Sequence, residues 1–221
     1  MKRRTLDVLF SAGGLAVAVL LLVLGLVMTS NANFAKDYVA EQLGEQKITF
    51  KSAETLTDAE KQSACLVEYA GQPLLTGKQA ECYANDFIGL HLRAGPDAKT
   101  YAELGDVQSG LRAQITAATA ANSSNLPALQ KQLADTTAQR ETQFKGETLR
   151  GLLLTSYGFS VFGVKGEQAA TVAYLAAAVL ALLAIAGFIH AFRTPKDKTF
   201  AAPEPTSKPG TKPDAKPLIG V

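Results

Sequence analysis

Two stretches decide the fold: LFSAGGLAVAVLLLVLGLVMTS at residues 9–30 and QAATVAYLAAAVLALLAIAGFIHAF at residues 168–192. Neither contains aspartate, glutamate, lysine or arginine, although these four types make up 19% of the chain. Each stretch reaches the roughly 20 apolar residues that a helix needs to cross the hydrocarbon core of a bilayer. The sequence therefore predicts two transmembrane helices and argues against a soluble globular protein.

The first stretch has a second interpretation, as a secretory signal. Three basic residues, Lys2, Arg3 and Arg4, precede it, and small residues near Ser30 and Ala32 offer a cleavage site. A secretory signal, however, has an apolar core of about 7 to 15 residues, and this run is longer. We expect it to be retained as a membrane span.

Charge predicts the orientation of the two spans. Both flanks, residues 1–8 and 193–221, are rich in lysine and arginine, whereas residues 31–167 carry 13 basic and 16 acidic side chains, a net charge of −3. Basic flanks stay on the cytoplasmic side of a bacterial inner membrane. We expect both termini inside and the central domain outside. No basic stripe interleaved with aromatic residues appears, so nucleic acid is not an expected partner.

The central residues 31–151 predict an extracytoplasmic helical domain, and with it an all-α protein. Three threonines are followed three residues later by Glu or Gln, the spacing of a capping box. Apolar residues at helical spacing follow the last two, and we expect the helices to form a bundle. The pairs are Thr57 with Glu60, Thr76 with Gln79 and Thr100 with Glu103; the apolar faces are Ala80, Tyr83, Ala84, Phe87, Ile88 and His91, then Leu104, Val107, Leu111, Ile115 and Ala118.

Two further segments flank the second span. Residues 152–167 are apolar and aromatic, but Gly158 and Gly163 interrupt the pattern, which predicts a segment lying at the level of the lipid headgroups. Residues 193–221 hold six of the nine prolines and repeated Lys-Pro pairs. Such a composition buries too little apolar surface to fold, so a disordered cytoplasmic tail is expected.

The two cysteines, Cys65 and Cys82, fall on the first two predicted helices of the central domain. In an oxidising compartment a bridge between them would contribute about 3 kcal/mol by closing the intervening loop. The alternative is a pair of small unbonded apolar side chains. A disulfide is the prediction.

Small residues recur every four positions along the spans. They leave a strip on which another helix can approach closely, and the strip has three interpretations: packing between the two spans, contact with another membrane protein, or no specific contact. The residues are Gly14 and Ala18 in the first span and Ala169, Ala173, Ala177 and Ala181 in the second.

Residues that carry chemistry are few. His91 and His190 belong to different predicted regions and cannot share a site, and no phosphate-binding loop, serine elbow or Cys-x-x-Cys pair occurs. We expect no enzyme activity, no cofactor and no metal. Glu147 and Arg150 stand three residues apart; they predict a local ion pair, or alternatively a contact of Arg150 with a lipid phosphate or a partner's carboxylate at the membrane surface.

Several short motifs carry a resemblance. They are Gln46-Lys47-Ile48-x-Phe50, Tyr69-Ala70-Gly71-Gln72, Leu75-Thr76-x-x-Gln79-Ala80, Tyr83-Ala84-x-x-Phe87-Ile88-x-x-His91-Leu92 and Phe144-x-Gly146-Glu147-x-Leu149-Arg150-Gly151-x-Leu153-Leu154-x-x-Tyr157. Together they resemble a family of actinobacterial two-span membrane proteins, over residues 1–192. The layout is similar to that of accessory subunits of the actinobacterial respiratory supercomplex. The resemblance implies an envelope location and no particular reaction.

These observations favour a non-catalytic accessory or scaffolding protein of a bacterial membrane complex, with lipids and other integral membrane proteins, respiratory subunits among them, as partners. The competing hypothesis is an envelope sensor or a module that binds a lipid or small amphiphile.

Overall fold

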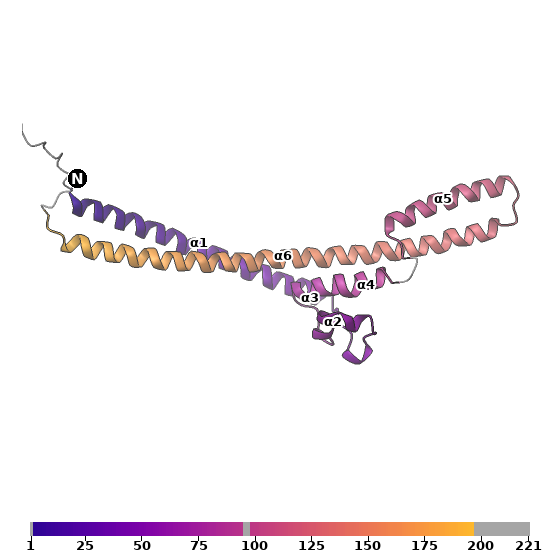
Figure 1. The fold of residues 1–221 in the computed structure, drawn as a ribbon, viewed down its shortest axis with the longest axis horizontal. Coiled ribbons are helices and arrows are strands. Elements are labelled where there is room, and N and C mark those ends of the chain that lie inside the picture. Colours follow the sequence, from indigo (N-terminus) through magenta and orange to yellow (C-terminus); the bar gives the residue numbers. More distant parts are fainter. Residues whose placement is uncertain (1, 95–97, 197–221) are drawn as a thin grey trace, which may run out of the picture. The chain divides into compact units, whose positions relative to one another are not determined.

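The computed structural model describes residues 2–94 and 98–196, and within these ranges every regular element is helical (Figure 1). Most of the predicted C-terminal tail, residues 193–221, lies outside them. Two helices are long and apolar enough to span a membrane, judged by length and composition: α1 (Arg3–Glu45) and α6 (Leu126–Arg193). Each contains one of the two apolar stretches.

Helix α6 runs without interruption through residues 152–167. Gly158 and Gly163 therefore interrupt the apolar pattern but not the helix, and a location at the headgroup level stays a prediction. A Cβ atom on Gly163 would lie 3.1 Å from the Cβ of Ala35, so the glycine serves a close helix contact. Glycine in a helix costs about 1 kcal/mol relative to alanine, which a well-packed contact can offset.

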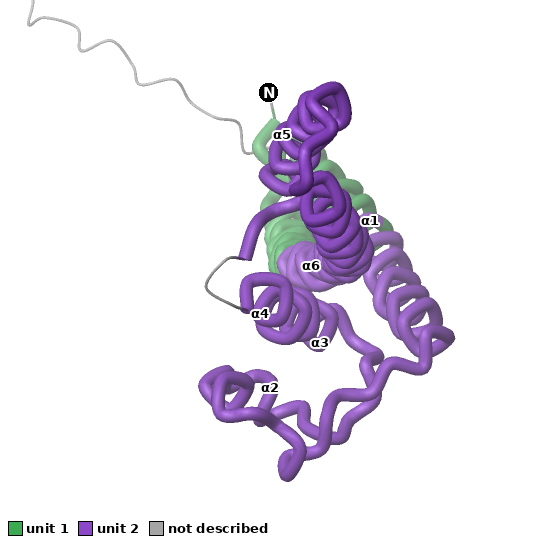
Figure 2. Tube along the Cα trace, turned by 90° about the vertical axis from the view of Figure 1, so that its right-hand side faces the viewer, with its two compact units in different colours: residues 1–23, 173–221 green, residues 24–172 purple. Residues whose placement is uncertain are grey.

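The chain divides into two compact units (Figure 2), and α1 and α6 contribute to both. In unit 1, residues 1–23 and 173–221, the two helices are antiparallel: Gly14 faces Ala184, and Gly187 faces Ser11. The buried residues are small and recur at spacings of four and seven. Partly buried residues between them, such as Gly14 and Gly187, complete the alternation of three and four that is typical of a coiled-coil seam. The buried residues include Ser11 and Ala18 on α1 and Ala173, Ala177, Ala184 and Ala191 on α6.

In unit 2, residues 24–172, the same two helices are again antiparallel. Gly163 and Gly166 of α6 lie against Ala35 and Ala32 of α1. Lys36 forms an ion pair with Glu167 beside this contact. Small side chains therefore bring the two backbones close together here as well.

The segment between α1 and α5 folds into short elements around one apolar core. These elements are the 3₁₀ helices Ala53–Thr55 and Glu60–Gln62, α2 (Ala64–Glu68), α3 (Gly77–Cys82), the π-helix Tyr83–Ile88 and α4 (Gly89–Leu92). Phe50, Leu66 and Leu74 fill the core together with Val39 of α1 and Leu153 of α6. The extended piece around Thr49 pairs with Pro73 as a single β-bridge.

Helix α5 (Tyr101–Ala120) lies alongside the first part of α6 as a hairpin (Figure 1). Leu111 and Ala118 of α5 and Leu129 of α6 form its buried centre. The central residues 31–151 thus have two separate apolar cores rather than the single bundle core expected from the sequence. The predicted capping boxes of Thr76 with Gln79 and Thr100 with Glu103 are confirmed at the starts of α3 and α5. Thr57 and Glu60 exchange the same pair of hydrogen bonds, but the 3₁₀ helix there begins at Glu60, with Ala59 as its N-cap.

Candidate functional site

Cys65 of α2 and Cys82 of α3 form a disulfide, with their Cα atoms 6.0 Å apart. It joins the short elements of unit 2 across 17 positions of sequence. Ser63, the N-cap of α2, accepts a hydrogen bond from the amide of Leu66 and donates one to Asp86 of the π-helix at 3.0 Å. The polar contacts of Ser63 and the disulfide hold α2 in place from two sides.

Asp86 is close to the disulfide but does not make it a metal site. Its carboxylate oxygen lies 2.9 Å from Sγ of Cys65, and the three side chains are near enough to one another to hold an ion. A disulfide sulfur carries neither a proton to donate nor the negative charge of a thiolate ligand. In the oxidised protein these sulfurs are therefore neither hydrogen-bond donors to Asp86 nor ligands.

The most enclosed charged group of unit 2 is Glu60, whose side chain has 0% exposure. Lys51 donates to its Oε1 at 2.8 Å, and the amide of Thr57 donates to its Oε2 at 2.7 Å. Nε2 of His91, from α4, lies 3.5 Å from the same Oε1. Two neighbours in sequence, Lys51 and Thr57, and the more distant His91 thus meet at one carboxylate.

Opposing effects act on the pKa of Glu60. Burial alone would raise it, but the hydrogen bonds from Lys51 and Thr57 and the charge of Lys51 outweigh burial and hold the pKa at about 2. The carboxylate is therefore ionised at neutral pH and fully engaged. A group so occupied acts as a structural ion pair, not as a general base.

His91 has the tautomer that its contacts dictate. Its Nδ1–H donates to the carbonyl of Phe87 at 2.7 Å, and its ring packs on the Phe87 ring with centroids 4.6 Å apart. Nε2 faces Glu60, so protonation of this nitrogen would complete an ion pair. The sequence placed His91 at a core edge without a carboxylate neighbour on its own helix; the carboxylate comes from 31 positions earlier, which helical spacing does not reveal.

Arg150 lies where α6 passes the π-helix. It forms the predicted ion pair with Glu147 at 3.1 Å, and it also donates to Oδ1 of Asn85 at 3.2 Å. Its Nε is buried without a partner among the described residues. The guanidinium therefore joins two elements of unit 2, and a contact with lipid or a partner stays a prediction.

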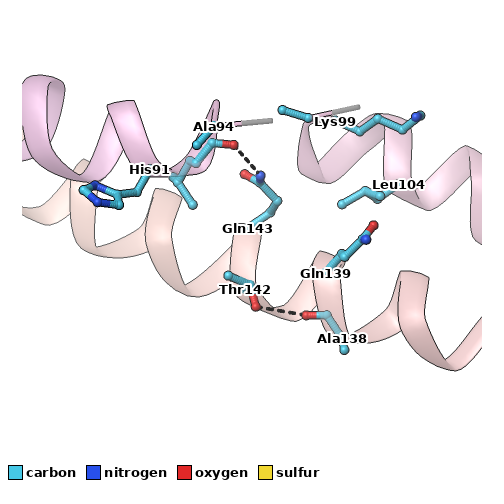
Figure 3. A pocket seen from close by; sticks show the side chains of 10 residues that line it. His91, Ala94, Lys99, Leu104, Ala138, Gln139, Thr142 and Gln143 are labelled. Atoms are coloured by element: carbon cyan, nitrogen blue, oxygen red, sulfur yellow. Dashed lines mark hydrogen bonds between the residues drawn. The ribbon is translucent and has the colours of Figure 1, made fainter. Parts of the chain in front are cut away.

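A polar pocket of about 470 Å³ opens beside α4 (Figure 3). Gln143 of α6 donates to the carbonyl of Leu92 at 2.9 Å and closes one wall, while Lys99 and Leu104 stand on the other. The walls come from both sides of residues 95–97, which the structure does not describe. We assign no function to this pocket.

The remaining predicted residues lie along α1 and α6. Gly14, Ala18, Ala173 and Ala177 lie on the α1–α6 seam of unit 1, whereas Ala169 of unit 2 and Ala181 of unit 1 are partly exposed. His190 has its Nδ1 3.1 Å from Oδ2 of Asp7 on α1. The sequence missed this pair because its members are 183 positions apart.

No protein-family model, curated protein or solved structure matches the chain. The contacts of the charged side chains and of His91 therefore bear on the function. Glu60 is neutralised by Lys51, Arg150 is paired with Glu147, and His91 contacts Phe87 and Glu60 rather than a hydroxyl or thiol nucleophile.

Proposed function

We propose that the protein is a non-catalytic accessory or scaffolding protein of a bacterial cytoplasmic membrane complex. In this proposal the two apolar stretches of α1 and α6 cross the bilayer, both termini are cytoplasmic, and residues 31–151 lie outside. The observation that carries it is that α6 contains both the second half of the α5–α6 hairpin and the second apolar stretch. A hairpin whose second helix is also a membrane span suits an arm that a membrane-anchored protein offers to a partner.

The α5–α6 hairpin has the properties of such an arm. Its apolar side chains pack against each other in one narrow seam. A buried polar group, Gln108, donates to Thr137 at 2.8 Å and accepts from Arg140 at 2.9 Å. One polar residue in a coiled-coil seam fixes the register of the two helices at a cost in stability. The outer faces of both helices stay exposed and are available to a partner.

Two independent features support the proposed orientation. Lys2, Arg3 and Arg4 precede the first apolar stretch, which favours a cytoplasmic N-terminus. The Cys65–Cys82 bridge belongs to the central segment, and disulfides persist in oxidising compartments outside the cytoplasm. Both features favour an outer location for the central segment.

The proposed partners are integral membrane proteins, with subunits of a respiratory complex as the first class to test on the strength of the resemblance. The experiment is purification of the full chain from its native membranes in mild detergent, followed by quantitative mass spectrometry. We expect membrane proteins at a fixed stoichiometry. Leu111→Glu, which opens the hairpin seam, should release them, whereas Val67→Glu, at an exposed position of α2, should not.

Purification of a single species with no stoichiometric partner would overturn the accessory role. If Leu111→Glu retains every partner, the protein would still belong to a complex, but the α5–α6 hairpin would not be the part that binds the partners. A reporter that fluoresces only in the cytoplasm, fused near Lys99, tests the orientation. Fluorescence of this fusion would reverse the proposed orientation.

The competing function, a module that binds a lipid or small amphiphile, is favoured by one observation. An apolar groove lies between α1 and α6 in unit 2.

A further inference from the structure

The groove between α1 and α6 has a volume of about 460 Å³ and belongs wholly to unit 2. Tyr38 and Leu43 of α1 line one side, Leu152 and Phe159 of α6 line the other, and Ile48 contributes from the extended piece that follows α1. Most of its lining is apolar. Several walls are nevertheless open to solvent, with exposures of 62% for Leu152, 46% for Tyr38 and 39% for Phe159.

We propose that this groove binds one acyl chain of a membrane amphiphile. Apolar walls that lie outside the hydrocarbon core are unfavourable when they are exposed to water. An acyl chain laid along these walls shields them from the water. A chain that comes from the bilayer is already in an apolar environment. The gain therefore comes from covering the walls of the groove.

The size of the groove favours a hydrocarbon chain over a protein helix. The lining runs from residue 149 to 159 on α6, which at the helical rise is about 15 Å. A helix of that length with its side chains, about 10–12 Å wide, occupies more than twice the volume of the groove, about 460 Å³. A hydrocarbon chain needs less volume over the same length.

Hydrogen bonding argues against an extended peptide as the occupant. Peptide N–H and C=O groups need partners when they are buried. Two of the polar side chains in the lining are already used, because Thr155 donates to Gly151 and Ser156 donates to Leu152 of the same helix. Tyr38, Gln42 and Gln46 remain, which are fewer than the N–H and C=O groups of an extended peptide as long as the groove. An acyl chain makes no such demand.

The position of the groove suits a chain supplied by the membrane. Tyr38 lies eight residues beyond the first apolar stretch, about 12 Å along α1. The rings of Phe34, Tyr38 and Phe159 form a chain of contacts leading to it, with centroids 5.7 and 5.9 Å apart. Aromatic rings are favoured at the headgroup level of a bilayer. The groove also runs parallel to the two helices that would enter the membrane.

The test uses the full chain in nanodiscs of phosphatidylethanolamine and phosphatidylglycerol, with a palmitic acid probe that carries a photoreactive diazirine at its far end. We expect saturable labelling of peptides that contain residues 38–48 and 149–159, removed by excess palmitate. Leu152→Glu puts a charge in the groove, and Gln42→Trp fills it without adding charge. Both should lower the competable labelling at least tenfold. Val67→Glu, outside the groove, should leave it unchanged.

Three results would overturn the inference. The first is labelling that does not saturate or is confined to residues 9–30 and 168–192. The second is labelling of both groove variants at the level of the unmodified chain, and the third is loss of groove labelling only when two copies of the chain associate, which would make the groove a self-association surface. Thermal unfolding of each variant separates lost binding from lost folding, since Leu152 and Gln42 are both exposed. The inference does not depend on the accessory role, because it needs no partner protein.

Discussion

Gly163 of α6 lies directly against Ala35 of α1, and a side chain at this position would also come within 3.3 Å of the carbonyl of Ala32. These two nearest atoms are a Cβ and a backbone oxygen, which cannot move aside as the end of a flexible side chain could. The closest approach of α1 and α6 in this part of unit 2 is therefore set by the absence of one Cβ atom.

Gly163→Val should destabilise unit 2 by about 1–3 kcal/mol, the usual cost of overpacking a close helix contact. The matched control is Gly158→Val on the same helix, where nothing lies within 4 Å of an added Cβ. Thermal unfolding in detergent, followed by circular dichroism, measures both. Equal melting temperatures for the two variants would contradict the close contact.

Acid should destabilise the protein through Glu60. Its pKa in the folded state, about 2, is below the ordinary value of 4.5. At pH values between these two numbers, the folded state therefore binds fewer protons than the unfolded state. The contribution of Glu60 to stability is complete above pH 4.5 and declines as the pH falls from 4.5 to about 2. Urea unfolding at pH 7, 4, 3 and 2 should show this decline, and Glu60→Gln should make it shallower. Parallel pH profiles for the two proteins would remove Glu60 as its source.

Reduction of the Cys65–Cys82 bond should lower the stability of unit 2 by about 2–4 kcal/mol. The measurement is unfolding with and without a reductant, and the Cys65→Ala, Cys82→Ala double variant serves as the control because the reductant cannot affect it further. A thiol count on denatured, unreduced protein should find none. Two free thiols would show that the bond is not formed.

The α1–α6 seam of unit 1 predicts which alanines can be replaced by a larger residue without separating the two helices. Ala177 is buried and Ala178 is exposed. Cysteines introduced at Gly14 and Ala184 should cross-link readily, because the two Cβ atoms would be 3.9 Å apart, within the range of a disulfide. Ala177→Leu should reduce the yield of this cross-link, and Ala178→Leu should not. An unchanged yield in both variants would argue that the seam does not hold the helices together.

The elements most predictable from the sequence are those specified locally. Thr76 with Gln79, and Thr100 with Glu103, lie within one helical turn, so their spacing alone predicts the caps that the structure contains. The two apolar stretches were equally clear, because a long uncharged run has few alternatives.

The features that were missed depend on partners remote in sequence. Gly158 and Gly163 interrupt the apolar pattern of residues 152–167, but helix packing outweighs the low helix propensity of glycine and α6 is continuous. The four-residue repeat grouped Ala169 and Ala181 with Ala173 and Ala177, whereas two helices that wind around each other bury residues at alternating spacings of three and four. The meeting of Glu60, Lys51 and His91 likewise requires the folded short elements.

The π-helix at Tyr83–Ile88 has a consequence for how this protein can change during evolution. The amide of Gly89 donates to the carbonyl of Ala84, five residues back, so the winding here accommodates an additional residue. Winding all of these residues as an ordinary α-helix would turn every later side chain by about 100° relative to those before it. Cys82 and His91 could then not both face Cys65 and Glu60. We expect homologous chains either to keep six residues with π winding here, or to lose one residue and wind as an ordinary helix with Cys82 and His91 facing the same way.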